Sequence, residues 1–347
     1  LEIPEGQDPI MIGSPTAILE EPIIRLLFQS IITIFGTSPF GNSRVILPCN
    51  NIPIACQTKP VESGPTSKVA WVTPAVRAPR IRQQTFESAA AKTKVSYHIY
   101  TPKAYDREMG RRFPVLYWLH GSGGGLEGIA PLSGFFQEAM QSGKIPPMLI
   151  IFPNGMASSM WCDSKDGLVP MEQVVIRDLI PHIDKSFRTV TNRSGRIVEG
   201  FSMGGYGAAR LGFKYPELFG TVSILAGGPL DIDFKGPRAT ENPGERKRIL
   251  LTTFGGDLED YRAKSPLTIA KAKANDIHGN SRVRVAVGKL DFTAELNQSF
   301  SEQMKNHGID HAFKLVPGVG HNTIALLKGL GESNWDFYKA ALGEEKK

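Results

Sequence analysis

The chain is predicted to form an α/β fold in which helices flank a mainly parallel sheet. Several short apolar runs end in glycine or proline, helical patterns separate them, and one early segment alternates apolar and polar residues. Continuous apolar runs are typical of parallel strands that are buried on both faces. The regular pattern starts near residue 84, so we expect one domain over 84–347 and an N-terminal extension of unknown fold over 1–83.

The first half of the domain is expected to contain three strands and a bent helix. TKVSYHIYTP (93–102) alternates as a half-buried strand does. FPVLYWLHG (113–121) and PMLIIFPNG (147–155) are apolar runs typical of buried parallel strands. MEQVVIRDLIPHIDKSF (171–187) has a helical pattern, and Pro181 within it predicts a bend or a restart of that helix.

Strands and helices continue to alternate in the second half of the domain. RIVEGFS (196–202) predicts a strand, and GGYGAARLGFKYP (204–216) predicts a helix that ends near its proline. GTVSILAGG (220–228) and SRVRVAVGKLD (281–291) predict further strands. The helices expected after them lie at about 293–307 and 323–341. Because ligands bind at the carboxyl ends of strands in such sheets, functional side chains are expected there.

The N-terminal extension has no sustained periodicity, and we assign it no fold. An accessory domain and a pro-segment both remain open, and VESGPTSK (61–68) has the composition of a linker. The most apolar run, at 23–36, is interrupted by Arg25, so no membrane span is expected. It is also a poor signal peptide, because acidic residues precede it. A secreted or periplasmic location is favoured, a cytoplasmic one is not excluded, and the oligomeric state is left open.

The charge and the cysteines exclude some classes of partner. The net charge is +6, but the basic clusters at 77–82 and 245–248 lack interleaved aromatic residues and any helix-turn-helix or zinc-finger pattern. We therefore expect no nucleic-acid partner, although attraction to acidic polymers stays open. Cys49, Cys56 and Cys162 have no spacing typical of a zinc site, so no metal is expected. Cys49 and Cys56 form a disulfide in one interpretation, and all three are thiols in the other.

Ser202 is the candidate nucleophile. Residues 200–204 read Gly-Phe-Ser-Met-Gly and match the G-x-S-x-G pattern, between a predicted strand and a predicted helix. The glycines leave room for a sharp turn, and the helix N-terminus favours developing negative charge. The alternative is a tight turn with a purely structural role.

His321 is the candidate base that takes the proton from the serine hydroxyl. In this architecture the order along the chain is serine, acid, histidine, and only four histidines follow Ser202. His278 lies in a polar loop, His307 ends a helix and His311 opens the last strand. His321 follows that strand in a glycine-rich loop, at the edge of the sheet where Ser202 is expected.

Asp291 is the candidate acid that orients His321. It ends the predicted strand at 281–291, one strand before the one that leads to His321. Asp231 and Asp233, after an earlier strand, are rivals, and Asp257 is a weaker one. An N-cap for the helix that begins near Thr293 is the structural alternative for Asp291.

Backbone amides are expected to stabilise the negative oxygen of a tetrahedral intermediate. The Met203 amide, directly after the serine, is the first candidate, and the amide of Gly121 or Ser122 is the second. His120 is expected to support that glycine-rich loop near the substrate. The loop also matches G-x-G-x-x-G, but no acidic residue ends the next strand, so a dinucleotide site is not expected.

From TFESAAAKTKVSYHIYTP (85–102) to the C-terminus the chain resembles the esterase D-type family of α/β-hydrolases. The motifs that carry the resemblance are PVLYWLHGSGG, FPNG, RDLIPHID, EGFSMGGYGAARLGFKYPELFG and GVGHNT. The family includes feruloyl esterases, acetyl xylan esterases, enterochelin esterases and S-formylglutathione hydrolases, with mycolyltransferases as relatives. The resemblance implies an α/β-hydrolase fold and a triad of Ser202, Asp291 and His321.

The activity implied is that of a serine carboxylesterase that forms an acyl-enzyme and needs no cofactor. Its expected substrates are acetyl, other short acyl, or feruloyl and similar aromatic esters, free or linked to plant polysaccharides. Trp161 is expected to stack on a phenolic ring or a sugar, unless it has a buried packing role. Phe201 and His120 are further candidate substrate-binding residues. Phe201 stands where S-formylglutathione hydrolases have a histidine, which weakens the thioesterase interpretation. Acyl transfer and non-catalytic polymer binding also remain open as functions.

Overall fold

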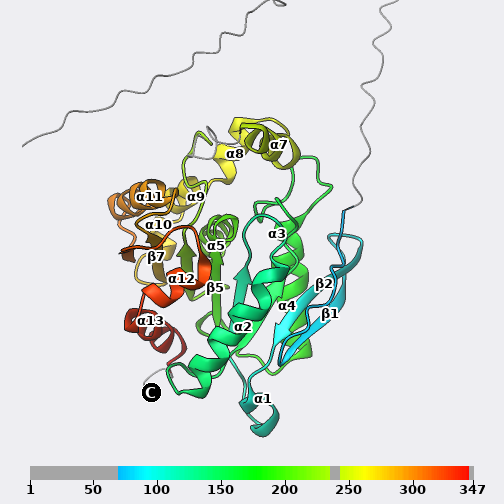
Figure 1. Ribbon diagram of the computed structural model, residues 1–347. Coiled ribbons are helices and arrows are strands. Elements are labelled where there is room, and N and C mark those ends of the chain that lie inside the picture. The colour runs from blue at the N-terminus through cyan, green and yellow to red at the C-terminus, as the bar shows by residue number, and fades with distance from the viewer. Residues whose placement is uncertain (1–68, 235–242, 344–347) are drawn as a thin grey trace, which may run out of the picture. The chain divides into compact units, whose positions relative to one another are not determined.

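A single eight-stranded sheet forms the centre of the domain in the computed structural model, which describes residues 69–234 and 243–343 (Figure 1). The spatial order is β1-β2-β4-β3-β5-β6-β7-β8. β1 and β2 pair antiparallel, as do β2 and β4, and every later pair is parallel. The strands are β1 Ile81–Ser88, β2 Thr93–Tyr100, β3 Val115–Leu119, β4 Leu149–Pro153, β5 Arg196–Phe201, β6 Thr221–Leu225, β7 Arg282–Gly288 and β8 Ala312–Val316.

Helices cover both faces of this sheet. In the first half they are α1 Lys103–Arg107, α2 Leu126–Gln141, α3 Met171–Gln173, the π-helix η1 Val174–Leu179, α4 Ile180–Ser186, the 3₁₀-helix η2 Arg193–Gly195 and α5 Met203–Lys214. In the second half they are α7 Pro243–Phe254, α8 Leu258–Lys264, α9 Pro266–Ala272, α10 Ala274–Ile277, α11 Ala294–Asn306, α12 Thr323–Gly329 and α13 Glu332–Leu342. Within the described ranges no helix has the length and apolarity needed to cross a bilayer.

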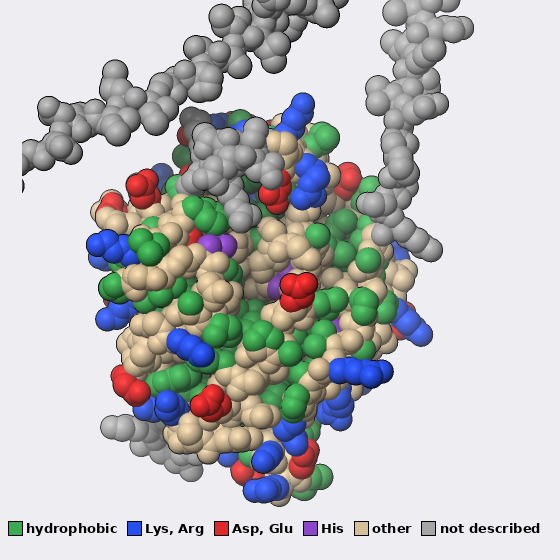
Figure 2. Space-filling view, in the orientation of Figure 1, with side chains coloured by type: hydrophobic (Ala, Val, Ile, Leu, Met, Phe, Trp, Pro, Cys, Tyr) green, Lys and Arg blue, Asp and Glu red, His purple; other side chains and the backbone are tan. Residues whose placement is uncertain are grey.

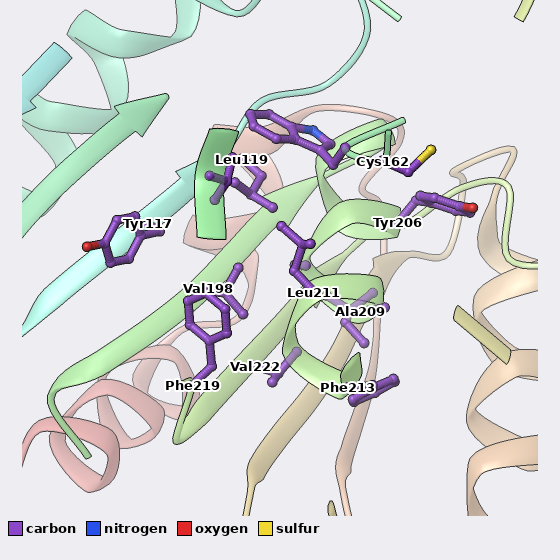
Figure 3. Close-up of a cluster of buried hydrophobic side chains, with 14 of the residues drawn as sticks. Tyr117, Leu119, Cys162, Val198, Tyr206, Ala209, Leu211, Phe213, Phe219 and Val222 are labelled. Atoms are coloured by element: carbon purple, nitrogen blue, oxygen red, sulfur yellow. The ribbon is translucent and has the colours of Figure 1, made fainter. Parts of the chain in front are cut away.

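The alternation of side chains along β3 shows how the sheet forms two cores. Leu116 and Trp118 point to one face and pack in a cluster with side chains of α2, α12 and α13. Tyr117 and Leu119 point to the other face and pack with side chains that include Leu211 of α5 (Figure 3). All five β3 residues are buried, as the continuous apolar run predicts.

Several sequence expectations need correction. The helix expected over 323–341 is two helices, α12 and α13, which are separated at Leu330 and Gly331, where Gly331 has a φ of 58°. The irregularity expected near Pro181 is the π-helical turn η1, which runs into α4 just before the proline. The antiparallel strand β1 and the helices between β6 and β7 have no counterpart among the elements expected from the sequence.

The domain boundary predicted between residues 83 and 84 falls inside β1. Residues ahead of β1 are also bound to the sheet: the Ser96 amide of β2 donates to the Trp71 carbonyl at 2.9 Å. The predictions for residues 1–68, which include Cys49 and Cys56, lie outside the described residues. Cys162 is a buried free thiol.

Candidate active site

Ser202 occupies the sharp turn between β5 and α5. Its φ of 59° and ψ of −119° are strained for a residue with a side chain, and such strain persists only where the surroundings enforce it. A Cβ on Gly200 would lie 2.2 Å from the Gly204 carbonyl oxygen, and a Cβ on Gly204 would lie 1.9 Å from the Leu119 oxygen. Both glycines of the motif are therefore required for the backbone to pass so close beside the serine.

His321 lies in the loop between β8 and α12, with its ring against the serine. Its Nε2 is 3.0 Å from Ser202 Oγ, so it can accept the hydroxyl proton. Its Nδ1 is 2.8 Å from Asp291 Oδ2 and donates to that carboxylate. Three side chains that are far apart in the sequence thus form one continuous hydrogen-bonded chain.

Two aromatic rings flank the imidazole of His321. The Phe201 ring centroid lies 4.6 Å from that of His321, and the Phe292 centroid lies 4.4 Å away. Phe292 is not among the residues predicted from the sequence, although it directly follows the predicted acid. These contacts restrict the orientations open to the imidazole.

Asp291 follows β7, and its side chain is fully buried. Its second oxygen, Oδ1, accepts from both the amide and the hydroxyl of Thr293, each at 2.8 Å. Burial acts to raise the pKa of Asp291, but the hydrogen bonds from His321 and Thr293 outweigh it and lower that pKa below its usual value. The alternative role as an N-cap is not observed, because Thr293 is the N-cap residue of α11 and Asp291 binds Thr293 itself.

The other histidines after Ser202 have partners elsewhere. His278 Nδ1 lies 2.6 Å from the Gly308 carbonyl oxygen, and His311 Nε2 lies 2.7 Å from Ser301 Oγ. His307 is the C-cap of α11. Of the histidines that follow Ser202, His321 is the one the fold brings to the serine.

The rival acids are likewise engaged away from His321. Asp233 forms an ion pair with Arg262 at 3.0 Å, and its amide donates to Asp231 Oδ1. Asp257 forms an ion pair with Lys165. Asp291 is the acid that the structure places against the histidine.

The residues that carry the predicted oxyanion amides line the cavity beside the serine or directly follow it. The Met203 amide is the first N–H of α5, and amides in the first turn have no acceptor within their helix. Gly121 lies against the serine, since a Cβ there would be 3.2 Å from Ser202 Cβ. Ser122 is exposed and lines the same cavity.

The His120 side chain binds backbone groups of two loops, at Gly121 and at Gly155. Its Nδ1 lies 2.7 Å from the Gly121 oxygen, and its Nε2 accepts from the Gly155 amide at 3.0 Å. Burial lowers the pKa of His120 to about 4, so the ring is neutral at pH 7. A neutral ring can donate at Nδ1 and accept at Nε2, as these contacts require.

The expected role of Trp161 in substrate binding needs correction. Its side chain is fully buried, and its indole N–H donates to the His120 carbonyl at 3.1 Å. The ring also packs edge-on against His120, at a centroid distance of 5.0 Å. Trp161 therefore has the buried packing role and lies against the glycine-rich loop at His120.

A cavity of about 260 Å³ opens beside Ser202. None of the described residues that line it carries a carboxylate, an ammonium or a guanidinium group. The lining residues are Trp118, His120, Gly121, Ser122, Gly125, Gly128, Leu132, Phe201, Ser202, His321 and Thr323. On this face apolar side chains gather over the middle, around α2, while charged side chains lie mostly toward the edges (Figure 2). Across residues 69–234 and 243–343 no group of three or more His, Cys, Asp or Glu side chains has an arrangement that could hold a metal.

Comparison with known proteins places the chain in a family. The sequence model of the family described as "Putative esterase" matches residues 88–345. An endo-1,4-beta-xylanase/feruloyl esterase of Xylanibacter ruminicola is 31% identical over 171 residues, which are 46% of this chain and 23% of that protein. An esterase of Mycobacterium tuberculosis is 27% identical over 267 residues, which are 70% of this chain and 56% of that protein. The chain thus spans a quarter to just over half of the length of these curated relatives.

Solved structures show the same fold. A ferulic acid esterase has a TM-score of 0.62 at 20% identity and covers 75% of this chain and 98% of its own. An S-formylglutathione hydrolase of Agrobacterium tumefaciens has a TM-score of 0.60 at 17% identity, with coverage of 76% and 95%. The chain therefore belongs to the "Putative esterase" family and has the α/β-hydrolase fold.

Proposed function

We propose that this chain is a serine carboxylesterase that works through an acyl-enzyme. The observation that carries the proposal is the hydrogen-bonded chain from Asp291 through His321 to Ser202, which ends at an open cavity. Membership of an esterase family supports it independently.

In the acylation step, Ser202 Oγ attacks the ester carbonyl while His321 Nε2 takes the hydroxyl proton. The amides of Met203 and Gly121 or Ser122 stabilise the oxyanion that forms. His321 then returns the proton to the leaving alcohol, and the acyl group remains on the serine. Asp291 holds the imidazole with its Nε2 toward Ser202 and stabilises the imidazolium.

In the deacylation step, water takes the place of the alcohol. His321 removes a proton from the water as it attacks the acyl carbonyl, and the same amides stabilise the second oxyanion. The proton then goes to Ser202 Oγ, which leaves as the hydroxyl. The carboxylic acid departs, and the free enzyme is restored without a cofactor.

The proposed substrates are esters of short or aromatic carboxylic acids, including acetyl and feruloyl groups on plant polysaccharides. A cavity whose described lining has no charged side chain suits a neutral acyl group, and one curated relative is named an endo-1,4-beta-xylanase/feruloyl esterase.

The proposal is tested by hydrolysis of p-nitrophenyl acetate and methyl ferulate. The Ser202→Ala variant is expected to lose kcat by on the order of 10⁴- to 10⁶-fold relative to the unaltered chain. Ser194→Ala, an exposed position remote from the cavity, is the matched control and should retain full activity. Equal activity of the Ser202 variant and the unaltered chain would refute the proposal, and so would an unaltered chain that cleaves neither ester.

Thioester hydrolysis and acyl transfer need different substrates or acceptors. An S-formylglutathione hydrolase has the same fold, but Phe201 stands in place of the histidine usual before the nucleophile in those enzymes. Assay of S-formylglutathione beside the two oxygen esters compares thioesterase with carboxylesterase activity. Product analysis with added alcohol separates acyl transfer from hydrolysis, because both share the acyl-enzyme.

A further inference from the structure

The first turn of α2 presents a glycine to the cavity beside Ser202. A Cβ on Gly128 would have one neighbour within 4 Å, the Leu132 Cδ1 at 3.6 Å, which is ordinary contact. Gly125 differs, because its φ is 71° and a Cβ there would lie 2.2 Å from the His120 Cβ. The fold therefore requires glycine at 125, whereas at 128 a side chain would fit the backbone and occupy space at the cavity wall.

The chemistry of the tetrahedral intermediate decides which part of the substrate lies at this wall. Its oxyanion must face the amides of Met203 and of Gly121 or Ser122, and its leaving oxygen must face His321 Nε2, which protonates it. The fourth substituent of the tetrahedral carbon, besides Ser202 Oγ, the oxyanion and the leaving oxygen, is the acyl chain, which must point away from all three. Among the described lining residues, Trp118, Gly128 and Leu132 form a stretch of wall that includes neither a candidate oxyanion amide nor a member of the triad.

We propose that the acyl group of the substrate lies between Trp118, Gly128 and Leu132, and that Gly128 sets the largest acyl group the enzyme accepts. This proposal rests on the serine esterase function proposed above. The wall has no charged group, so the acyl group is uncharged. The whole cavity beside Ser202 measures about 260 Å³, and an enclosed apolar cavity of about 150 Å³ holds benzene, so the volume leaves room for one aromatic ring in the acyl group.

The test compares two leucine variants of the same helix. Gly128→Leu fills the wall of the cavity. Gly134→Leu is the matched control, because Gly134 is exposed on α2 and a Cβ there has nothing within 4 Å. Each variant is assayed with p-nitrophenyl acetate and p-nitrophenyl benzoate, which differ only in the acyl group, and with 1-naphthyl acetate, which has a bulky alcohol.

Gly128→Leu is expected to lower kcat/KM for the benzoate by on the order of 10- to 100-fold, with a much smaller change for both acetates. Gly128→Ala should lower it less, and Gly134→Leu should leave all three values unchanged. A selective loss of naphthyl acetate would overturn the proposal, because the wall would then face the alcohol. An unchanged benzoate to acetate ratio in a folded Gly128→Leu variant would also overturn it.

Failure of this inference is distinguishable from failure of the esterase function. If the unaltered chain hydrolyses the esters and the Ser202→Ala variant does not, the function stands whatever Gly128→Leu shows. Thermal unfolding of each variant identifies any that does not fold, and Gly128→Ala then provides the comparison with the smaller side chain.

Discussion

Two polar networks in this domain are built from the same three segments: β5, β7 with its following loop, and the chain after β8. The closed network lies between the sheet and α13 and joins Glu199, Arg284 and Tyr338. The Tyr338 hydroxyl lies 2.8 Å from Glu199 Oε1, and Arg284 Nη2 donates to Glu199 Oε2 at 3.2 Å. The Glu199 and Tyr338 side chains are fully buried.

The open network joins Ser202, His321 and Asp291. Ser202 directly follows the carboxyl end of β5, three residues after Glu199. The Asp291 side chain is as buried as that of Glu199, but the His321 side chain is 18% exposed and Ser202 lines a cavity. In the closed network the polar groups bind one another, so none of the three is left for a ligand. In the open network Ser202 lines the cavity. The position of the side chains relative to the sheet, and not burial of the carboxylate, therefore decides which of the two networks reaches open space.

The first prediction disrupts the open network and has the largest expected effect. Asp291→Asn should lower kcat by about 10³- to 10⁴-fold, because an amide nitrogen toward His321 favours the wrong tautomer. Its free energy of unfolding should change far less than its activity, since the remaining oxygen can still accept from Thr293. Steady-state kinetics with p-nitrophenyl acetate and urea unfolding measure the two quantities. A kcat within tenfold of the unaltered chain would contradict the assignment of Asp291.

The second prediction disrupts the closed network and should have the opposite profile. Arg284→Met should lower the free energy of unfolding by about 3–5 kcal/mol, because Glu199 is left buried without its cation. The kcat per folded molecule should change little. Arg282→Met, an exposed position on the same strand, is the matched control for urea unfolding. A large loss of kcat with unchanged stability would show that the two networks are not separable.

The third prediction concerns the pH dependence of stability. It uses a third network, in which the buried Glu172 pairs with the buried Arg210 and the partly exposed Lys214. Burial acts to raise the pKa of Glu172, but Arg210, Lys214 and Tyr215 outweigh it and lower that pKa to about 2. A carboxylate with a lowered pKa adds stability above its unfolded value of 4.5, and this stability is lost as the pH falls toward 2. The shift corresponds to roughly 3 kcal/mol.

Urea unfolding at pH 6 and pH 3 tests this third prediction. The unaltered chain should lose more stability between the two values than Glu172→Gln does, because the amide does not titrate. Glu127→Gln, at an exposed position, is the control. Equal losses in the unaltered chain and in Glu172→Gln would show that the ion pairs with Arg210 and Lys214 are not linked to folding.

The fourth prediction, with the smallest effect, concerns the rings beside His321. Phe292→Leu should lower kcat about 2- to 12-fold, the range that corresponds to an aromatic contact of about 0.5–1.5 kcal/mol, with little change in KM. Phe292→Tyr keeps the ring and should retain the activity. A change in KM alone would indicate that Phe292 contacts the substrate and does not position the histidine.

The parts that could be predicted from the sequence are those that local geometry controls. The Gly-Phe-Ser-Met-Gly turn is one, because Gly200 and Gly204 are required by backbone contacts within the turn and with the neighbouring strand β3. The apolar runs of β3 and β4 are another, since strands buried on both faces have few alternatives. The order serine, acid, histidine then left a small number of partners to choose from.

Tertiary packing decided the rest. A sequence pattern indicates that Trp161 is large and apolar, but only the fold shows it beneath His120 and away from the cavity. The choice of Asp291 over Asp231 and Asp233, the rings around His321 and the open wall at Gly128 likewise depend on segments that meet only in the folded chain. Local sequence determines the conformation of a turn, whereas the distance between two side chains depends on every element packed between them.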